Sequence, residues 1–308
     1  MKITSAVGHI VTILSCIYLV VIMYYNGSMD LAFYMNGMTL ATACISVVIY
    51  SLLVLLSSYC WFVIMSYIDK DSNMHFTGSN KIYAKANISK YLPGNVFQYL
   101  QRQAIGTAYG YTHASLALGS LLETVFVIVT VVALLILFML FGFQIPDPLV
   151  LCIQHKNTAL VVLLGIVLVL AAYLIKNRKF AFIKRMLSYG FLALFFKVAA
   201  NYSVILLLFG ILFAGLYMAL SGNTVTIIML GPFMFAFLAS WILGFITPGS
   251  PAGIGVRESI LLILLGTQFG RDQILITALA LRVVTICGDL LVFVAAYFDL
   301  FPRARSNE

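Results

Sequence analysis

The chain has 308 residues, of which 63% are hydrophobic and only 9% are charged, and its mean hydropathy is +1.07. Because roughly a quarter of the residues in a soluble domain are charged, this composition excludes an ordinary soluble protein and indicates an integral membrane protein. The formal net charge of +8 does not indicate nucleic-acid binding, because the basic residues lie between apolar runs, where they report orientation in the membrane.

Apolar runs recur along the chain. A bilayer core about 30 Å thick needs ~20 apolar residues per spanning helix. In chain order the runs lie at 5–25, 38–66, 114–143, 158–175, 187–218, 224–246 and 274–299. The shorter run 254–269 is predicted to be either an eighth crossing or a re-entrant half-helix. The alternation of a membrane β-strand is absent, so we expect an all-α polytopic bundle of about 7–8 transmembrane segments.

The whole chain, 1–308, is expected to be a single membrane domain, with a two-part organisation at 1–157 and 158–308. The first run is interpreted as a retained helix, the alternative being a signal peptide, because no small-residue cleavage site follows it. The five cysteines form no CxxC pair and are interpreted as small core residues: Cys16, Cys44, Cys60, Cys152 and Cys287. Neither a metal site nor a cofactor is expected.

The basic residues predict on which side of the membrane each connecting segment lies. The segments 67–90 and 176–185 and the C-terminal tail are rich in Lys and Arg, which is typical of cytoplasmic loops. Both termini are therefore predicted to be cytoplasmic. With the C-terminus on the cytoplasmic side, 254–269 is predicted to cross the membrane from the inner to the outer side and to end in a tight outer turn at 268–273. The alternative is a re-entrant arrangement of this run.

Ionisable side chains inside apolar runs are costly in a bilayer, so each marks either a functional site or a structural pair. The candidates are Arg102, His113, Glu123, Lys197, Arg257, Glu258, Arg282 and Asp289. Arg282 and Asp289 are seven residues apart and share a helix face, so a structural pair between them is the alternative to a functional role. Lys197 is expected to extend toward the membrane surface, and His113 to be a hydrogen-bonded histidine without a second metal ligand.

Two polar stretches interrupt the apolar pattern: KYLPGNVFQYLQRQ (90–103) and TPGSPAGIGVRE (247–258). Proline removes a backbone donor and glycine permits unusual backbone angles, so helix breaks are predicted at both places. The breaking residues are Pro93, Gly94, Pro248, Gly249 and Pro251. Broken helices inside a membrane offer free N–H groups and the positive end of a helix dipole to anions.

At the second break, Gly253 and Gly255 precede Arg257 and have no side chains to cover the backbone. A phosphate could therefore bind the backbone amides and the guanidinium together. Glu258 is either a balancing charge or only a cap for the following helix. The alternative is that both breaks are ordinary loops at the inner surface, with Arg102 and Arg257 touching lipid headgroups.

The two stretches together resemble the paired motifs of the lysylphosphatidylglycerol synthase transmembrane-region family. The likeness covers most of the chain, and its more specific part consists of Pro248, Gly249, Gly253, Gly255, Arg257 and Glu258. Ala252 departs from the pattern, since a glycine is expected there, and so do Phe97 and Gln98. The resemblance implies a flippase-like protein of the bacterial cytoplasmic membrane that moves or holds an anionic lipid or a lipid-linked saccharide.

Bifunctional relatives carry a soluble aminoacyl-transfer domain after the membrane region, whereas this sequence ends eight residues after Leu300. The resemblance therefore implies a stand-alone member that does not aminoacylate lipids by itself.

The leading hypothesis is a lipid translocator in which Arg257, Arg102 and Arg282 hold a phosphate. Glu123, Glu258 and Asp289 would balance the charge or couple transport to an ion. The sequence has no GxxxxGK[ST] motif for nucleotide hydrolysis, so transport is expected to be passive or ion-coupled. The alternative is a non-transporting accessory protein that anchors a glycosyltransferase or another envelope enzyme. An intramembrane enzyme ranks last, because no nucleophile and base are evident.

Overall fold

The computed structural model describes residues 36–69, 75–91, 96–140, 188–247 and 251–300. These residues form helices and no strands, and five of the helices are long and apolar enough to cross a membrane. The five are α3 (Gly37–Ile68), α6 (His113–Leu140), α10 (Tyr189–Ser221), α11 (Ile227–Ile246) and α13 (Arg271–Tyr297). The predicted all-α, multi-pass membrane bundle is confirmed. The predicted spans 5–25 and 158–175 lie outside the described residues.

The remaining described helices are too short to span a bilayer. They are α4 (Phe76–Asn87), α5 (Phe97–Ala108) and α12 (Val256–Phe269), with the 3-10 turns η1 (Ile88–Tyr91) and η2 (Pro251–Gly253). At 1.5 Å per residue, even α12 is only about 21 Å long. Together with α11, these elements build two helical hairpins. Hairpin 1 consists of α4, η1 and α5, and hairpin 2 consists of α11, η2 and α12.

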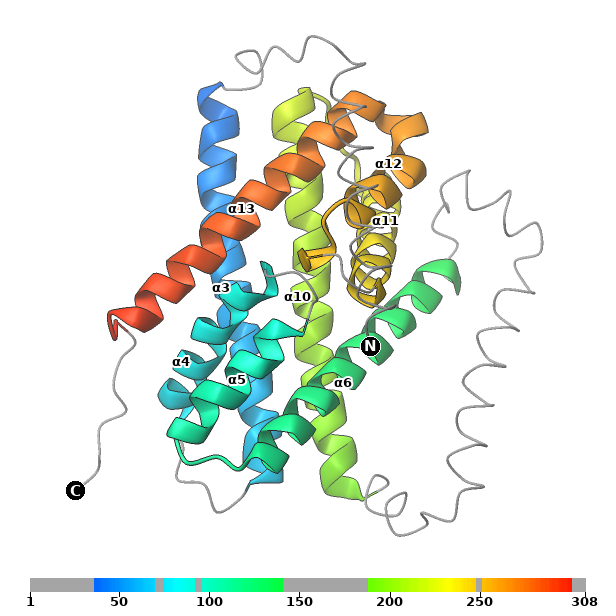
Figure 1. Cartoon of the computed structure of the whole chain (residues 1–308). Coiled ribbons are helices and arrows are strands. Elements are labelled where there is room, and N and C mark those ends of the chain that lie inside the picture. Colours follow the sequence, from blue (N-terminus) through cyan, green and yellow to red (C-terminus); the bar gives the residue numbers. More distant parts are fainter. Residues whose placement is uncertain (1–35, 70–74, 92–95, 141–187, 248–250, 301–308) are drawn as a thin grey trace, which may run out of the picture.

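Hairpin 1 begins and ends at the lower end of the bundle as drawn in Figure 1. The Phe76 ring at its start lies 5.6 Å from the Phe62 ring, near the end of α3. At its other end, Gly106 of α5 lies directly against Leu116, in the first turn of α6. The tip of this hairpin, η1, therefore points into the bundle.

Hairpin 2 enters from the opposite end. An aromatic cluster joins the last turns of α10, the early part of α11 and the end of α12: the Phe233 ring lies 5.1 Å from Tyr217 and 4.7 Å from Phe269. The tip, η2, is held near the middle of the 27-residue α13, where Arg282 Nη1 donates to the Ala252 carbonyl at 2.9 Å. Contacts between η1 and η2 bring the two tips together inside the bundle.

The long helices that precede the two hairpins run in opposite directions. The Thr39 hydroxyl at the start of α3 donates to the Ala219 carbonyl near the end of α10 at 3.0 Å. At the other end, the rings of Tyr67 and Phe191 are 6.2 Å apart. Each helix leads into a hairpin and then a second long helix, so the described residues show the same order twice, in inverted orientation (Figure 1).

Small residues let the helices approach closely, as is usual where lipid provides no hydrophobic driving force between them. Gly288 of α13 packs directly on Tyr50 of α3, and the Ser51 hydroxyl donates to the Gly288 carbonyl at 3.4 Å. Gly210 of α10 likewise packs against Met234 of α11. The first contact brings α13 against α3, and the second brings α11 against α10.

The structure corrects one prediction about a connecting segment and decides between two alternatives for another. The segment 67–90 is not simply a polar loop, because α4 occupies much of it and buries Ile82 and Ala86 completely. Of the two alternatives for 254–269, the structure fits the re-entrant half-helix, because α12 has 14 residues and starts at the tip of hairpin 2, inside the bundle. The break itself is confirmed, as is the tight turn at Gly270 (φ 86°) between α12 and α13.

Candidate functional site

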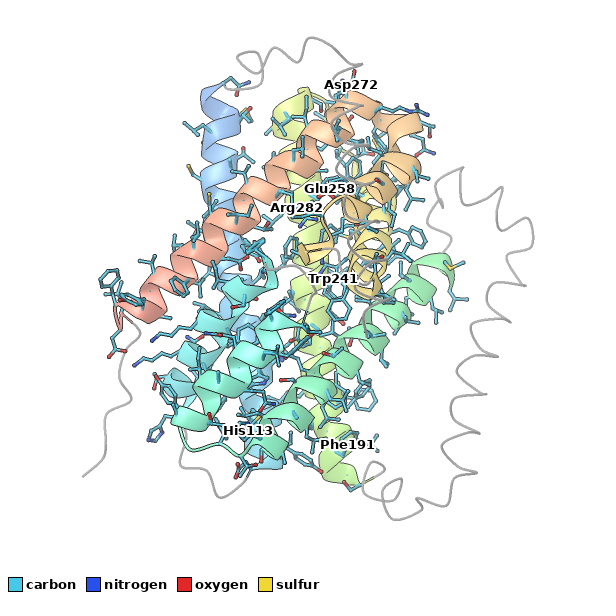
Figure 2. All side chains as sticks on the ribbon, in the orientation of Figure 1. His113, Phe191, Trp241, Glu258, Asp272 and Arg282 are labelled. Carbon is cyan, nitrogen blue, oxygen red and sulfur yellow. The ribbon has the colours of Figure 1, made fainter. Side chains whose placement is uncertain are left out.

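A cavity of about 200 Å³ lies where the two hairpin tips meet. Residues of both sequence motifs line it, together with side chains from the long helices. Its charged lining residues are Lys90, Arg102, Glu123, Arg257 and Arg282. Figure 2 shows Trp241, Glu258 and Arg282 in the central part of the molecule, with Asp272 at its upper end and His113 and Phe191 at its lower end.

Arg102 of α5 is fixed by an ion pair with Glu123 of α6, made through Arg102 Nη1 and Glu123 Oε2. The other carboxylate oxygen accepts from the Tyr202 hydroxyl at 2.7 Å. The guanidinium carbon lies 4.1 Å from the centre of the Tyr83 ring, and the whole residue is 2% exposed. The idea that Arg102 touches headgroups from a surface loop is therefore wrong.

A second ion pair fixes the tip of hairpin 2: Arg282 Nε of α13 bonds to Glu258 Oε1 of α12. The other Glu258 oxygen accepts from the Gly255 amide at 2.7 Å, so Glu258 both caps its helix and balances a charge. The Gly255 amide is thus already satisfied and is not free for an anion.

The two ion pairs occupy matching places in the inverted halves, with the charges exchanged. In the first half, the second arm of the hairpin carries the arginine (Arg102) and the following long helix carries the acid (Glu123). In the second half, the hairpin arm carries the acid (Glu258) and the long helix carries the arginine (Arg282). Each pair holds one hairpin against the long helix that follows it in the chain.

Asp289 of α13 belongs to a third cluster, and its side chain is 0% exposed. It accepts hydrogen bonds from Tyr50 at 2.9 Å, Asn87 at 2.7 Å and Tyr91 at 2.5 Å, and pairs with Lys90 Nζ at 2.7 Å. The tip of hairpin 1 is thereby tied to α13 and α3.

The pair between Arg282 and Asp289 does not form. Seven residues along a helix separate two positions by about 10.5 Å, which is too far for direct contact. Each side chain instead bonds to a different hairpin.

Arg257 differs from the other cations, because no described acid forms an ion pair with it. Its guanidinium carbon lies 5.7 Å from the centre of the Trp241 ring. Gly244 and Gly253 make room for its stem, since a Cβ at either position would lie within 3 Å of the Arg257 side chain. Arginine does not lose its proton in proteins, so Arg257 carries a positive charge in the cavity.

The site leaves hydrogen-bond donors and positive charge unmatched. Among the described residues, three buried guanidinium nitrogens have no acceptor: Arg102 Nε, Arg257 Nε and Arg282 Nη2. Four cations face three acids, so one positive charge remains. Buried donors without partners indicate a missing acceptor, and arginine recognises phosphate and carboxylate oxygens. The arrangement therefore suits an oxygen-rich anion.

Substituting Gly244 with alanine is expected to displace the Arg257 side chain, because the new Cβ would lie 2.6 Å from Arg257 Cγ. We expect the affinity for an anion in the cavity to fall about tenfold, the equivalent of ~1.4 kcal/mol. Gly215→Ala is the matched control, since its Cβ would meet nothing within 4 Å. Titration of both variants with a short-chain anionic lipid measures the difference, and equal affinities would contradict the role of Gly244.

The glycine-rich residues of the second break form the tip of hairpin 2. Pro251 begins η2, and Gly253 and Gly255 both have positive φ, at 72° and 84°. Ala252 has φ 49°, a left-handed conformation that favours glycine, which is the residue expected there. Pro93, Gly94, Pro248 and Gly249 lie outside the described residues.

The remaining candidates lie outside the cavity. His113 Nδ1 is 3.1 Å from Gln103 Oε1, and the exposed Lys197 lies over the Tyr59 ring. Cys60 is buried as predicted, whereas Cys44 and Cys287 are exposed, so the core interpretation is wrong for these two. Cys16 and Cys152 fall outside the described part of the chain. Within that part, no group of three or more His, Cys, Asp and Glu residues is arranged to hold a metal ion.

Several residues of the cavity were missed from the sequence, above all Lys90, Tyr50, Asn87, Tyr91 and Trp241. Lys90 belongs both to the Lys-rich segment 67–90 and to the start of the motif 90–103, and neither pattern distinguishes it from the neighbouring loop lysines. One signal relates the two motifs: Arg102 follows Pro93 by nine residues, and Arg257 follows Pro248 by the same number. That shared spacing relates the two motifs in the sequence, whereas the ion pairs match Arg102 with Glu258, the residue that follows Arg257.

No protein-family model matches the chain, and neither a curated protein nor a solved structure matches it significantly.

Proposed function

We propose that this membrane protein moves an anionic lipid across the bacterial cytoplasmic membrane and holds the phosphate of the headgroup at Arg257. The substrate is an anionic phospholipid or a lipid-linked saccharide, as the family resemblance implies. Transport is passive or coupled to an ion.

The observation that carries this proposal is the set of three buried guanidinium nitrogens without acceptors beside one uncompensated positive charge. Leaving a buried donor unpaired costs about 1–3 kcal/mol, so the cavity favours binding of an acceptor. A phosphate supplies several oxygens and a negative charge at once. Arg257 provides the charge, while Arg102 and Arg282 keep their acids and offer only their spare N–H groups.

The inverted hairpins support movement as well as binding. Transporters often place a substrate site at the interface of inverted repeats, between broken helices near the bilayer midplane. Here two hairpin tips from opposite ends of the bundle form the cavity. Small shifts of either hairpin would open the cavity toward its own end.

Reconstitution into liposomes with a fluorescent lipid tests the proposal. We expect labelled phosphatidylglycerol and phosphatidic acid to exchange between leaflets faster than in empty vesicles, and faster than phosphatidylcholine. Rates equal to those of empty vesicles across a panel that also includes a polyprenyl-phosphate saccharide would overturn transport. A non-transporting anchor would give that result and would instead co-purify with an envelope enzyme.

A further inference from the structure

Three ion pairs border the cavity, but only one of them contains a lysine. Arginine stays protonated at all relevant pH values and binds carboxylates in a rigid fork, so the pairs Arg102–Glu123 and Arg282–Glu258 are fixed. Lysine carries its charge on a flexible four-carbon stem. The pair Lys90–Asp289 is therefore the one that can open without moving a helix.

The position of Lys90 lets its flexible side chain turn from Asp289 toward the cavity. Lys90 lines the cavity at the tip of hairpin 1, whereas the carboxylate of Asp289 is fully buried behind it. Lys90 Nζ lies 2.7 Å from Asp289 Oδ2 and also donates to the Tyr50 hydroxyl at 3.1 Å. An anion in the cavity would compete with Asp289 for this ammonium group.

The charged and titratable neighbours come from every element around the pair. The Asp289 carboxylate pairs with Lys90, and the guanidinium groups of Arg257 in α12 and Arg282 in α13 line the same cavity as Lys90. Tyr50 of α3, Asn87 of α4 and Tyr91 of η1 are the neutral donors on Asp289.

These neutral donors would remain on Asp289 if Lys90 left, but the compensating charge would not. A buried carboxylate without a cation, and with an anion nearby, is strongly disfavoured and binds a proton instead.

We propose that Asp289 is a proton-binding site coupled to the substrate site: when the anionic headgroup enters, Lys90 turns from Asp289 toward it and Asp289 takes up one proton. The proton comes from water and ends on a carboxylate oxygen of Asp289, and no covalent bond of the lipid changes. Lipid and proton thus bind together and leave together. This inference rests on the proposed function and adds the coupling ion to it.

A path for the proton is present at the same place. The hydroxyls of Tyr50 and Tyr91 both touch Asp289, and both residues line the cavity. A proton can therefore pass from the cavity to the buried carboxylate without crossing an apolar layer.

The test is the pH dependence of lipid binding by the full-length protein in detergent. The probe is dihexanoyl phosphatidylglycerol, a phosphodiester that does not itself titrate near neutral pH. We expect the affinity of the wild type to fall about tenfold per pH unit as the pH rises, because one proton binds with each lipid. Calorimetry in two buffers with different ionisation enthalpies should count about one proton taken up per lipid.

The variant Asp289→Asn removes the proton-binding group and is expected to bind lipid without proton uptake and with little pH dependence. Asp272→Asn is the matched control, since this acid is exposed at the start of the same helix, and it should behave like the wild type.

Lipid binding by the wild type without proton uptake would overturn the coupling and leave the proposed function intact. If no anionic lipid bound at any pH, the proposed function would fail and the coupling with it. The wild-type measurement decides the question even if Asp289→Asn does not fold.

Discussion

Replacing Arg257 with alanine is expected to lower the affinity for anionic lipids about 10- to 100-fold and to slow their movement between leaflets by a similar factor. Hydrogen bonds to charged groups contribute about 1.5–3 kcal/mol, and no other described cation beside the cavity is free of an acidic partner. The protein should stay folded, because removing Arg257 breaks no ion pair. Lipid titration and the liposome exchange assay measure the two effects.

Arg271→Ala is the control for this substitution, since Arg271 is an exposed arginine at the turn between α12 and α13. It should bind and move lipid like the wild type. Arg257→Lys keeps the charge but loses the guanidinium donors, so intermediate affinity is expected. If Arg257→Ala bound and moved anionic lipids at the wild-type rate, the cavity could not be the substrate site.

Replacing Glu123 with glutamine is expected to destabilise the protein by about 3–5 kcal/mol, because breaking a buried ion pair leaves an uncompensated charge. Arg102 would stay 2% exposed beside a neutral side chain, with the Trp61, Tyr83 and Tyr99 rings as its remaining neighbours. Thermal or denaturant unfolding in detergent measures the loss. Wild-type stability in Glu123→Gln would show that the pair does not hold hairpin 1 in place.

The double variant Arg102→Met with Glu123→Leu provides the comparison. Replacing both partners of a buried ion pair with apolar residues of similar size is often neutral, so most of the stability should return. Since this variant removes both Arg102 and Glu123 from the cavity, lipid binding measured on it reports the joint contribution of the pair to the site.

The membrane class, the five described long helices and both helix breaks could be predicted, because each depends on local sequence. Apolar runs and Pro-Gly pairs act through hydrophobic length and backbone geometry, which a single segment reveals. The candidate charges Arg102, Glu123, Glu258 and Arg282 were found in the same way, since ionisable groups in apolar runs are conspicuous.

The pairing of these charges could not be predicted, because it depends on how deep each hairpin reaches. Hydropathy marked Lys90 as a loop residue, yet the tip of hairpin 1 places it against Asp289, 199 positions along the chain. Helical spacing likewise left open a pair between Arg282 and Asp289 within α13, whereas the fold supplies each of them with a partner from a different hairpin. Contacts between segments so far apart follow from the inverted packing of the halves.

The cavity of about 200 Å³ is smaller than the ~300–1,000 Å³ pockets that enclose drug-sized ligands, so it has room for a headgroup but not for acyl chains. The hydrocarbon tails of a bound lipid must then stay among neighbouring lipids. The affinity for a lipid should therefore depend on its headgroup and not on the length or unsaturation of its acyl chains. A water-soluble headgroup analogue such as glycerol phosphate would then be a competitive inhibitor.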